Sequence, residues 1–425
     1  MLRVVLNVWI TLLISVGVYA QKIGVAATPE LAGFSAERLK RIDVNMKSWV
    51  DQGWMNGAAA LVIRNGKIVY YKSTGYNDLK TKAPLAKDGI FRIASQTKAI
   101  TSVAVMMLYE EGKFLLDDPI SKFIPTFEKP TVLDKFNEKD TSYTTVPAKR
   151  EVTVRDLLTH TSGIGYAQIG SKEANSIYAK NNITAGLNVM DDKLSDAMNR
   201  LGKLPLMHNP GEKWTYGLNT DLLGRLVEIW SGVSLDEFLL QRIFTKLGMN
   251  DTYFNLPADK ATRLVNFFQE DSLGHLQKAV DVLGSSERFM DYPLRKKTYF
   301  SGGGGLSSTI YDYAIFLQML LNGGTYNGQQ ILSRNSVRMM TMNQIGDLSL
   351  GDNEKFGLGF GIATEKTSAK LPAQEGTFTW GGAFSTTYWV DPKEKMVVLL
   401  YRQMWGSHSE IDGIFKVLVY QAIVD

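Results

Sequence analysis

Residues 91–98 read Phe91-Arg92-Ile93-Ala94-Ser95-Gln96-Thr97-Lys98, and residues 99–108 after them are almost wholly apolar. With Gly112 as a stop, this pattern predicts a buried helix that begins near Ser95. Residues three apart share a helix face, so the Lys98 amine would lie beside the Ser95 hydroxyl. A serine becomes nucleophilic when a base takes its proton, and a buried lysine can be that base. Such strings also arise by chance as a helix cap followed by a solvated lysine, so this motif alone does not settle the chemistry.

Other hydrolytic chemistries lack their motifs in this chain. No Gly-x-Ser-x-Gly string is present, and no Gly-Lys pair is followed by Ser or Thr as in a phosphate-binding loop. The chain has no cysteine, which excludes disulfides, thiolate zinc sites and a cysteine nucleophile. None of its four histidines has a metal-ligand spacing: His160, His208, His275 and His408. These absences argue against metal-dependent hydrolysis, and acyl transfer by a serine would need no cofactor.

The two ends of the chain carry strand and helix patterns. Residues 35–49 form an amphipathic helical pattern that Gly53 would end. Residues 58–63 and 67–72 flank Asn65-Gly66, a pair typical of two-residue hairpin turns. Near the C-terminus, 386–390 and 396–402 flank the turn sequence 391–394, and a helical pattern covers 411–424. These patterns predict an α+β fold, with an antiparallel sheet built from N- and C-terminal segments and flanked by helices.

The middle of the chain is mainly helical. Residues 153–250 are dominated by helical patterns such as 222–230, with Ser231-Gly232 as a stop. We expect one catalytic domain over 21–425, with an α/β part at about 30–115 and 290–425 and an inserted helical lobe at about 116–289. Within that lobe, the threonine-rich residues 127–149 suggest a long surface excursion.

Residues 1–20 resemble a secretory signal peptide. Arg3 precedes an apolar run at 4–16, and Val18-Tyr19-Ala20 suits cleavage, although an uncleaved anchor is the alternative. Cleavage would leave a periplasmic or secreted protein without a membrane span. The 47 Lys and Arg residues are scattered and nearly balanced by 43 Asp and Glu, which argues against nucleic-acid binding.

Three further segments could contribute to a site. Residues 210–216 form a turn that ends in Tyr216, whose phenol could face a cleft or be an ordinary half-buried tyrosine. Residues 380–383, Trp-Gly-Gly-Ala, precede a predicted strand, where paired glycines allow close approach to the backbone or make a simple bulge. Residues 302–305 are four glycines, which we interpret as close packing beneath a cleft rather than ligand contact.

Taken in order, these segments resemble the serine β-lactamase and penicillin-binding-protein superfamily, in particular its class C-related, esterase-like branch. The resemblance runs from about Ser35 to Arg402 and includes the motifs at 91–98, 116–120, 154–163 and 222–225. It implies that Ser95 is the acylated nucleophile, with Lys98 and Tyr216 as proton-transfer residues. It also implies an oxyanion hole formed by the backbone N–H groups of Ser95 and Ala383. Trp380, Gly381 and Gly382 would bind substrate.

Two departures from that family pattern bear on the substrate. The Tyr-x-Asn element reads Tyr216-Gly217-Leu218 here, with Asn219 one place late, so an amide beside Lys98 is in doubt. Trp380 stands where relatives place a lysine that receives a β-lactam carboxylate, although Arg402 could supply another cation. We therefore predict a secreted carboxylesterase acting on small to medium esters. The alternatives are a D-amino-acid peptidase or weak class C-like β-lactamase on an amide substrate, and a non-catalytic penicillin- or peptidoglycan-binding module.

Overall fold

The computed structural model describes residues 22–183, 186–187, 192–279, 290–351, 354–406, 408 and 410–425. The predicted signal peptide at 1–20 lies outside these residues and stays a prediction.

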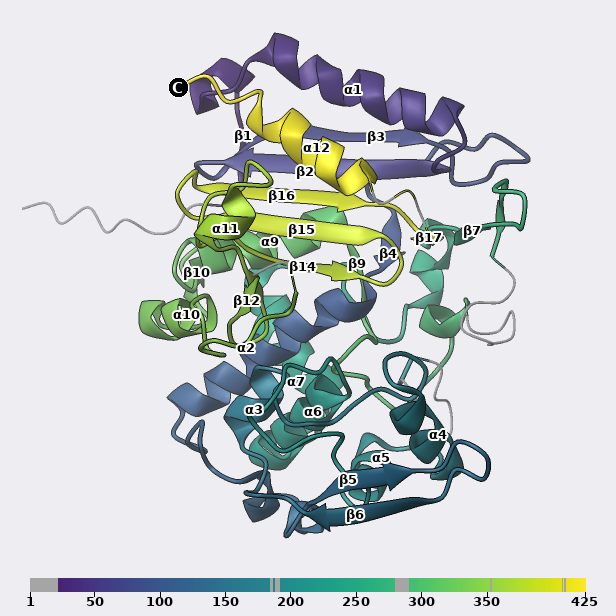
Figure 1. The fold of residues 1–425 in the computed structure, drawn as a ribbon. Coiled ribbons are helices and arrows are strands. Elements are labelled where there is room, and N and C mark those ends of the chain that lie inside the picture. The colour runs from purple at the N-terminus through teal and green to yellow at the C-terminus, as the bar shows by residue number, and fades with distance from the viewer. Residues whose placement is uncertain are drawn as a thin grey trace, which may run out of the picture.

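One large sheet joins the two ends of the chain, as the sequence predicts (Figure 1). Its order is β1-β3-β2-β16-β15-β14-β13-β12, and only the β1–β3 pair is parallel. The strands span β1 Gly24–Val25, β2 Gly57–Arg64, β3 Lys67–Gly75, β12 Lys355–Phe356, β13 Gly361–Ile362, β14 Phe378–Gly382, β15 Thr386–Asp391 and β16 Met396–Tyr401. β2 and β16 pair antiparallel from Arg64↔Met396 to Ala59↔Tyr401, so the N-terminal hairpin and the C-terminal strands share one hydrogen-bonded ladder.

The predicted hairpin turn forms as expected. Asn65 and Gly66 connect β2 and β3 with φ values of 52° and 70°. Positive φ at both positions is the requirement of a type I′ turn, whose twist matches that of the flanking strands.

Helices cover both faces of this sheet. α1 (Ala36–Asp51) and α12 (Glu410–Tyr420) pack on one face, and α9 (Ile310–Leu321) packs on the other (Figure 1). β2 is buried along its whole length because alternate side chains enter two different cores. Ala58, Ala60 and Val62 join the core under α1 and α12. Ala59, Leu61 and Ile63 join the main core, which also holds α9 and α2 (Thr97–Glu110).

The C-terminal helix is shorter than predicted. We expected a helix over 411–424, but α12 ends at Tyr420. The chain leaves the helix because Ile423 forms a bridge with Phe34 and the Val424 N–H bonds to the Gly33 carbonyl oxygen. Backbone hydrogen bonds therefore hold the segment just before α1 against the residues that follow α12.

The middle of the chain forms the predicted helical lobe. Its helices are α3 Val154–Leu158, α4 Lys172–Lys180, α5 Leu194–Leu201, α6 Asn219–Ser231, α7 Leu235–Leu239 and α8 Thr245–Leu247. Gly232, with φ 78°, ends α6 at the predicted stop. The 127–149 excursion is not irregular. It folds as an antiparallel hairpin of β5 (Thr131–Phe136) and β6 (Tyr143–Pro147). The Leu133 N–H donates to the Leu206 carbonyl oxygen and the Leu206 N–H donates to the Thr131 carbonyl oxygen, which anchors the hairpin to the lobe.

Short elements complete the fold. β7 (Phe268–Glu270) and β8 (Leu276–Lys278) lie within the range we expected for the helical lobe, but β7 pairs with β17 (Met404–Trp405) near the C-terminus. The two parts of the chain are therefore interleaved there. The remaining elements are β4 Ile90–Arg92, β9 Ser307–Thr309, β10 Thr325–Tyr326, β11 Gln329–Gln330, α10 Arg334–Met340 and α11 Glu365–Ser368.

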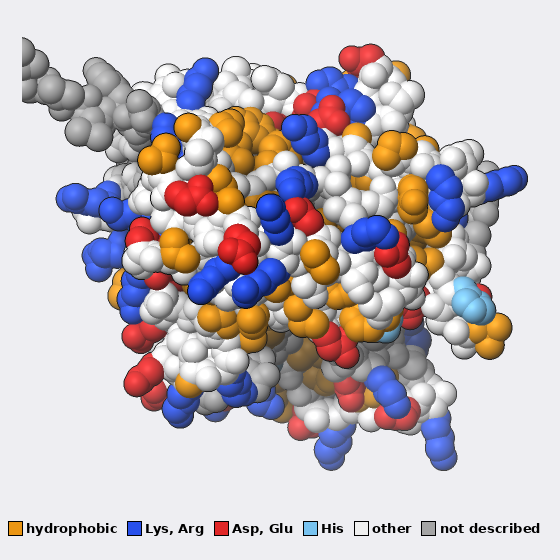
Figure 2. Space-filling view, turned by 90° about the horizontal axis from the view of Figure 1, so that it is seen from above, with side chains coloured by type: hydrophobic (Ala, Val, Ile, Leu, Met, Phe, Trp, Pro, Cys, Tyr) orange, Lys and Arg blue, Asp and Glu red, His pale blue; other side chains and the backbone are white. Residues whose placement is uncertain are grey.

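The surface above α1 and α12 has mixed charge. Basic and acidic side chains are interspersed on this face, and described pairs such as Lys47–Asp51 and Lys72–Asp43 join them (Figure 2). Among the described helices, none is both long and apolar enough to cross a membrane.

Candidate active site

Ser95 lies in a tight turn just ahead of α2. The residues Ala94–Gln96 form a single 3₁₀ turn that follows β4 and leads into the helix. Ala94 has φ 42°, an uncommon value for a residue with a side chain, so the turn needs support from its surroundings. The Tyr313 hydroxyl donates to the Gln96 carbonyl oxygen at 2.8 Å, and the Tyr401 hydroxyl donates to the Gln96 side chain. The large sheet and α9 thereby fix the turn that presents Ser95.

Lys98 and Tyr216 both reach the Ser95 hydroxyl, as the sequence predicts. Ser95 Oγ lies 2.6 Å from Tyr216 Oη and 3.3 Å from Lys98 Nζ. Lys98 is buried on the first turn of α2, whereas Tyr216 lies just before α6 on the helical lobe. The three side chains therefore meet where the sheet part and the lobe face each other.

Tyr166 is the site residue that sequence reasoning missed. Its hydroxyl accepts a hydrogen bond from Lys98 Nζ at 2.9 Å, and Lys98 also donates to the Gly303 carbonyl oxygen at 2.6 Å. Tyr166 follows the recognised motif at 154–163 by three residues, so the proximity of a tyrosine to that motif was the available signal. Asn219 does not take this place. It bonds instead to His160 and Ser162, deeper in the lobe.

The surroundings of Lys98 favour its ammonium form. Burial opposes the charge, but the neighbouring phenols of Tyr166 and Tyr216 outweigh it, and the pKa of Lys98 is raised. A lysine that acts as the base would need the opposite direction, a pKa that burial depresses. The geometry agrees with a charged amine, because an ammonium donates three hydrogen bonds and Nζ faces three oxygen atoms. Burial and the positive charge of Lys98 together hold the pKa of His160 well below its usual value, so this histidine is neutral.

The loop 159–166 connects Tyr166 to Tyr216. The His160 carbonyl oxygen accepts from the Thr215 N–H at 2.8 Å, and the Gly165 carbonyl oxygen accepts from the Leu218 N–H at 3.1 Å. His160 is in a left-handed conformation, with φ 57°, and its ring lies 5.1 Å from that of Tyr216. The two tyrosines are therefore positioned by one continuous backbone contact.

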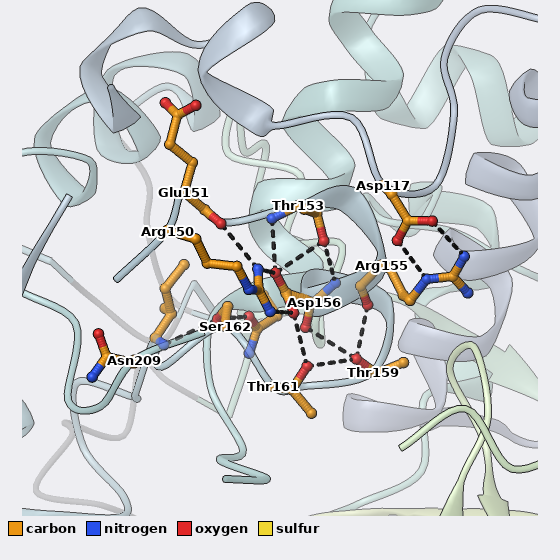
Figure 3. Close-up of polar contacts among 12 residues, drawn as sticks. Asp117, Arg150, Glu151, Thr153, Arg155, Asp156, Thr159, Thr161, Ser162 and Asn209 are labelled. Carbon is orange, nitrogen blue, oxygen red and sulfur yellow. Dashed lines mark hydrogen bonds and ion pairs between the residues drawn. The ribbon is translucent and has the colours of Figure 1, made fainter. Parts of the chain in front are cut away.

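A polar network around Asp156 is hydrogen-bonded to that loop at Thr161 (Figure 3). The Asp156 carboxylate accepts two hydrogen bonds from Arg150, at 2.6 and 2.9 Å, and further ones from the Thr153 N–H and from the hydroxyls of Thr153 and Thr161. Thr153 and Asp156 form a capping box that begins α3. The network ties the start of α3 to Thr161, next to His160.

A mostly apolar cavity opens beside Ser95. Its described lining includes five apolar side chains, those of Ala94, Ile169, Leu187, Ala383 and Trp405. The polar side chains of the lining are those of Ser95, Tyr166, Gln168 and Tyr216, and the described lining includes no Lys or Arg. Gly303 and Gly304 complete it. Ser95 and Ala383, the two residues expected to form an oxyanion hole, therefore border one cavity.

Trp380 packs against Tyr216. The residues Trp380, Gly381 and Gly382 are absent from the described cavity wall. The Trp380 ring instead packs 5.6 Å from the ring of Tyr216. A Cβ at Gly382 would lie 2.4 Å from the Ile93 carbonyl oxygen, so this glycine lets β14 approach the turn that carries Ser95. A direct role of these three residues in substrate binding stays a prediction.

Arg402 does not replace the missing lysine. Its side chain is buried and forms a bidentate ion pair with Asp412 at 2.8 Å, on the α12 side of the sheet. The glycines 302–305 pack closely, as predicted, since a Cβ at Gly302 would lie 2.5 Å from the Thr220 carbonyl oxygen. Two of them also border the cavity, which we did not expect.

Among the described residues, no group of three or more His, Asp or Glu side chains could hold a metal ion.

An α+β fold that places a serine beside a lysine and a tyrosine in a cavity defines a class, the serine hydrolases with the β-lactamase and transpeptidase fold. Comparisons with known proteins give the same result. The model of the Beta-lactamase family matches residues 41–415. Protein Rv1367c of Mycobacterium tuberculosis is 33% identical over 361 residues, which cover 82% of this chain and 86% of that protein. Esterase EstB of Burkholderia gladioli is 27% identical over 384 residues, which cover 88% and 93% of the two chains.

The structure of simvastatin synthase (LovD) from Aspergillus terreus superposes with a TM-score of 0.76 at 24% identity, covering 91% of this chain and 98% of that one. The chain belongs to the Beta-lactamase family. It is a serine hydrolase of that family.

Proposed function

We propose that this protein is a carboxylesterase that hydrolyses small to medium esters through an acyl-enzyme on Ser95. The observation that carries the proposal is the double contact of Ser95 Oγ with Tyr216 Oη and Lys98 Nζ at the edge of an apolar cavity. The similarity to an esterase over most of both chains supports it.

In the acylation step, Tyr216 is the base. The Lys98 ammonium has no lone pair with which to accept a proton, whereas Tyr216 Oη lies 2.6 Å from Ser95 Oγ. The phenolate takes the Ser95 proton while Oγ bonds to the ester carbonyl carbon. As the tetrahedral intermediate collapses, the ester C–O bond breaks and Tyr216 returns the proton to the leaving alcohol.

Water completes the reaction by the same route. It attacks the acyl carbon, gives its proton to Tyr216, and Ser95 leaves with that proton as the acid is released. In both steps, negative charge develops on the carbonyl oxygen, and the backbone N–H groups of Ser95 and Ala383 stabilise it. Such donors contribute roughly 3 kcal/mol each in hydrolases.

The cavity wall favours neutral, apolar substrates. A β-lactam brings a carboxylate, and transferring an unpaired charge from water into an apolar cavity is costly. The described wall offers that carboxylate no Lys or Arg, and Arg402 is already paired with Asp412. Ile169, Leu187 and Trp405 instead offer apolar contact to an acyl or alcohol group.

Parallel kinetics with two substrate classes test this function. We expect kcat/KM for short-chain p-nitrophenyl esters to exceed that for a chromogenic cephalosporin by at least about tenfold, the effect of roughly 1.4 kcal/mol. Intact-mass spectrometry after incubation with a fluorophosphonate, a short ester and a penicillin would show which reagents acylate the protein, with Ser95→Ala as the control. Efficient cephalosporin hydrolysis with negligible ester turnover would refute the esterase and favour the β-lactamase.

Export to the periplasm or the medium is part of the proposal. It rests on the signal-like pattern at 1–20. N-terminal sequencing of the mature protein should begin at Gln21, and a retained Met1 in a membrane fraction would show an anchor instead.

A further inference from the structure

Asp221, in the first turn of α6, is a buried carboxylate that the reaction above does not use. Its side chain is fully buried, and the donors that act on it, the Ser301 and Tyr299 hydroxyls and the Gly303 N–H, make no hydrogen bond of standard geometry with either carboxylate oxygen. An acidic residue at the third position of a helix can accept the backbone N–H of the N-cap residue, as in a capping box. Asp221 does not do so in the described structure, so helix capping does not account for its burial.

Gly303 shows how close Asp221 lies to the catalytic lysine. A Cβ added at Gly303 would lie 2.5 Å from Asp221 Oδ2 and 3.4 Å from Lys98 Nζ. The Asp221 carboxylate and the Lys98 amine therefore both lie next to Gly303, whose carbonyl oxygen accepts the 2.6 Å hydrogen bond from Lys98. Glycine at position 303 leaves the space into which the carboxylate reaches.

The titratable groups that face Asp221 are Lys98, Tyr166 and Tyr299. Asp192 and Arg200 form an ion pair with each other, and both act electrostatically on Tyr299. Burial raises the pKa of Asp221 to about 6, while the Ser301 hydroxyl and the Lys98 ammonium act in the opposite direction. The carboxylate is therefore ionised at neutral pH, and Lys98 is the cation that compensates its charge.

We propose that Asp221 is a positioning residue whose buried carboxylate, together with the phenols of Tyr166 and Tyr216, keeps Lys98 in its ammonium form. The inference rests on the proposed function of the Ser95 centre. A buried lysine without a counter-charge loses its proton readily, and documented pKa values fall to about 5–6. The proposed reaction needs the positive charge of Lys98 beside Tyr216. Asp221 thus acts on Ser95 only through Lys98, and it touches neither the substrate nor the nucleophile.

The rate of Ser95 labelling by a fluorophosphonate, followed against pH, tests this inference. The probe needs an activated serine but no particular ester. In the wild type, labelling should persist to the ordinary lysine range, about pH 10. In Asp221→Asn, the alkaline limb should move to lower pH by at least about one pH unit, the effect of removing an opposite charge at close range. At pH 8 this variant should be labelled about tenfold more slowly, and the difference should shrink as the pH falls to 6.

Glu228→Gln is the matched control. Glu228 lies on the same helix and pairs with Arg225 at 3.0 Å, away from the cavity, so this variant should keep the wild-type pH profile. Thermal melting at pH 8 checks that Asp221→Asn is folded. The wild-type profile is informative without any variant, because an alkaline limb near pH 7 would overturn the inference.

The outcomes separate the inference from the function on which it rests. An Asp221→Asn profile equal to that of the wild type overturns the inference alone. A labelled wild type that hydrolyses no ester overturns the esterase proposal and leaves the role of Asp221 intact. A wild type that the probe does not label overturns both.

Discussion

Asp156 and Asp221 occupy the same position in two helices of one lobe, yet they differ in every contact. Each is the third residue of its helix, α3 or α6, and each is buried. Asp156 completes a capping box and accepts five hydrogen bonds, two of them from Arg150 (Figure 3). Asp221 accepts no hydrogen bond of standard geometry in the described structure, although the Ser301 and Tyr299 hydroxyls and the Gly303 N–H act on it.

This difference in hydrogen bonding indicates a structural role for Asp156 and an electrostatic role in the active site for Asp221. A satisfied buried carboxylate fixes one geometry, because every lone pair has a donor. A buried carboxylate without well-formed hydrogen bonds raises the free energy of the folded state. Such a group is typical of functional sites, where its charge shifts the pKa of a neighbouring residue. Asp156 is hydrogen-bonded to Thr161 in the loop that carries His160, whereas Asp221 lies near Lys98. The predictions below test that division of roles.

The largest effect should come from Ser95. Ser95→Ala removes the only serine of the chain that combines the buried turn with contacts to Lys98 and Tyr216 among the described residues. We expect ester turnover to fall by roughly 10⁴-fold or more and fluorophosphonate labelling to vanish, with an unchanged melting temperature. Near-native turnover in this variant would refute the whole assignment.

Lys98 and Tyr216 should act as one unit. Lys98→Ala and Tyr216→Phe should each reduce kcat by about a hundredfold or more, the usual range for general acid–base groups. The double variant should lose much less than the product of the two effects, because both groups serve the same proton transfers. Additive losses in steady-state kinetics would contradict a shared role.

Asp221→Asn should stabilise the fold while it slows the reaction. Burial raises the pKa of Asp221 to about 6 in the folded state, whereas its value in the unfolded state is near 4. Above about pH 6 the buried charge therefore lowers the free energy of unfolding, and below about pH 4 this loss of stability disappears. The variant should therefore be more stable than the wild type at pH 8, by up to about 3 kcal/mol, and equal to it at pH 3.5. Urea unfolding at both pH values measures this, and a loss of stability at pH 8 would show that the carboxylate is structural.

Asp156→Asn should show the opposite behaviour, with the smallest effect on activity. The amide loses part of the contact with Arg150 and cannot accept all five hydrogen bonds, which should cost about 1–3 kcal/mol of unfolding free energy. Well below the melting temperature, kcat should stay within about twofold, since Asp156 contacts neither Ser95 nor Lys98 among the described residues. A large drop in kcat without a loss of stability would break the comparison between the two aspartates.

The sequence alone determined the parts of this protein that depend on local pattern. The apolar run after Lys98, the Asn65-Gly66 turn and the Gly232 stop follow from helical periodicity and backbone preferences, which neighbouring residues set. The ordered motifs between Ser35 and Arg402 also pointed to the family, and the helix start placed Ser95 beside Lys98.

Only the tertiary structure decided which distant groups surround that pair. Tyr166, Gly303 and Asp221 reach Lys98 from three separate segments, and no periodicity in the sequence relates them. The charge of Lys98 depends on these distant groups too, because burial alone lowers the pKa of a lysine whereas the phenols that surround it raise that pKa. The positions of Trp380 and Arg402 also depend on tertiary packing. Trp380 packs against Tyr216, and Arg402 forms an ion pair with Asp412. Electrostatic energies depend on distances through space, and these are set only when the sheet, the loop 159–166 and the lobe have packed together.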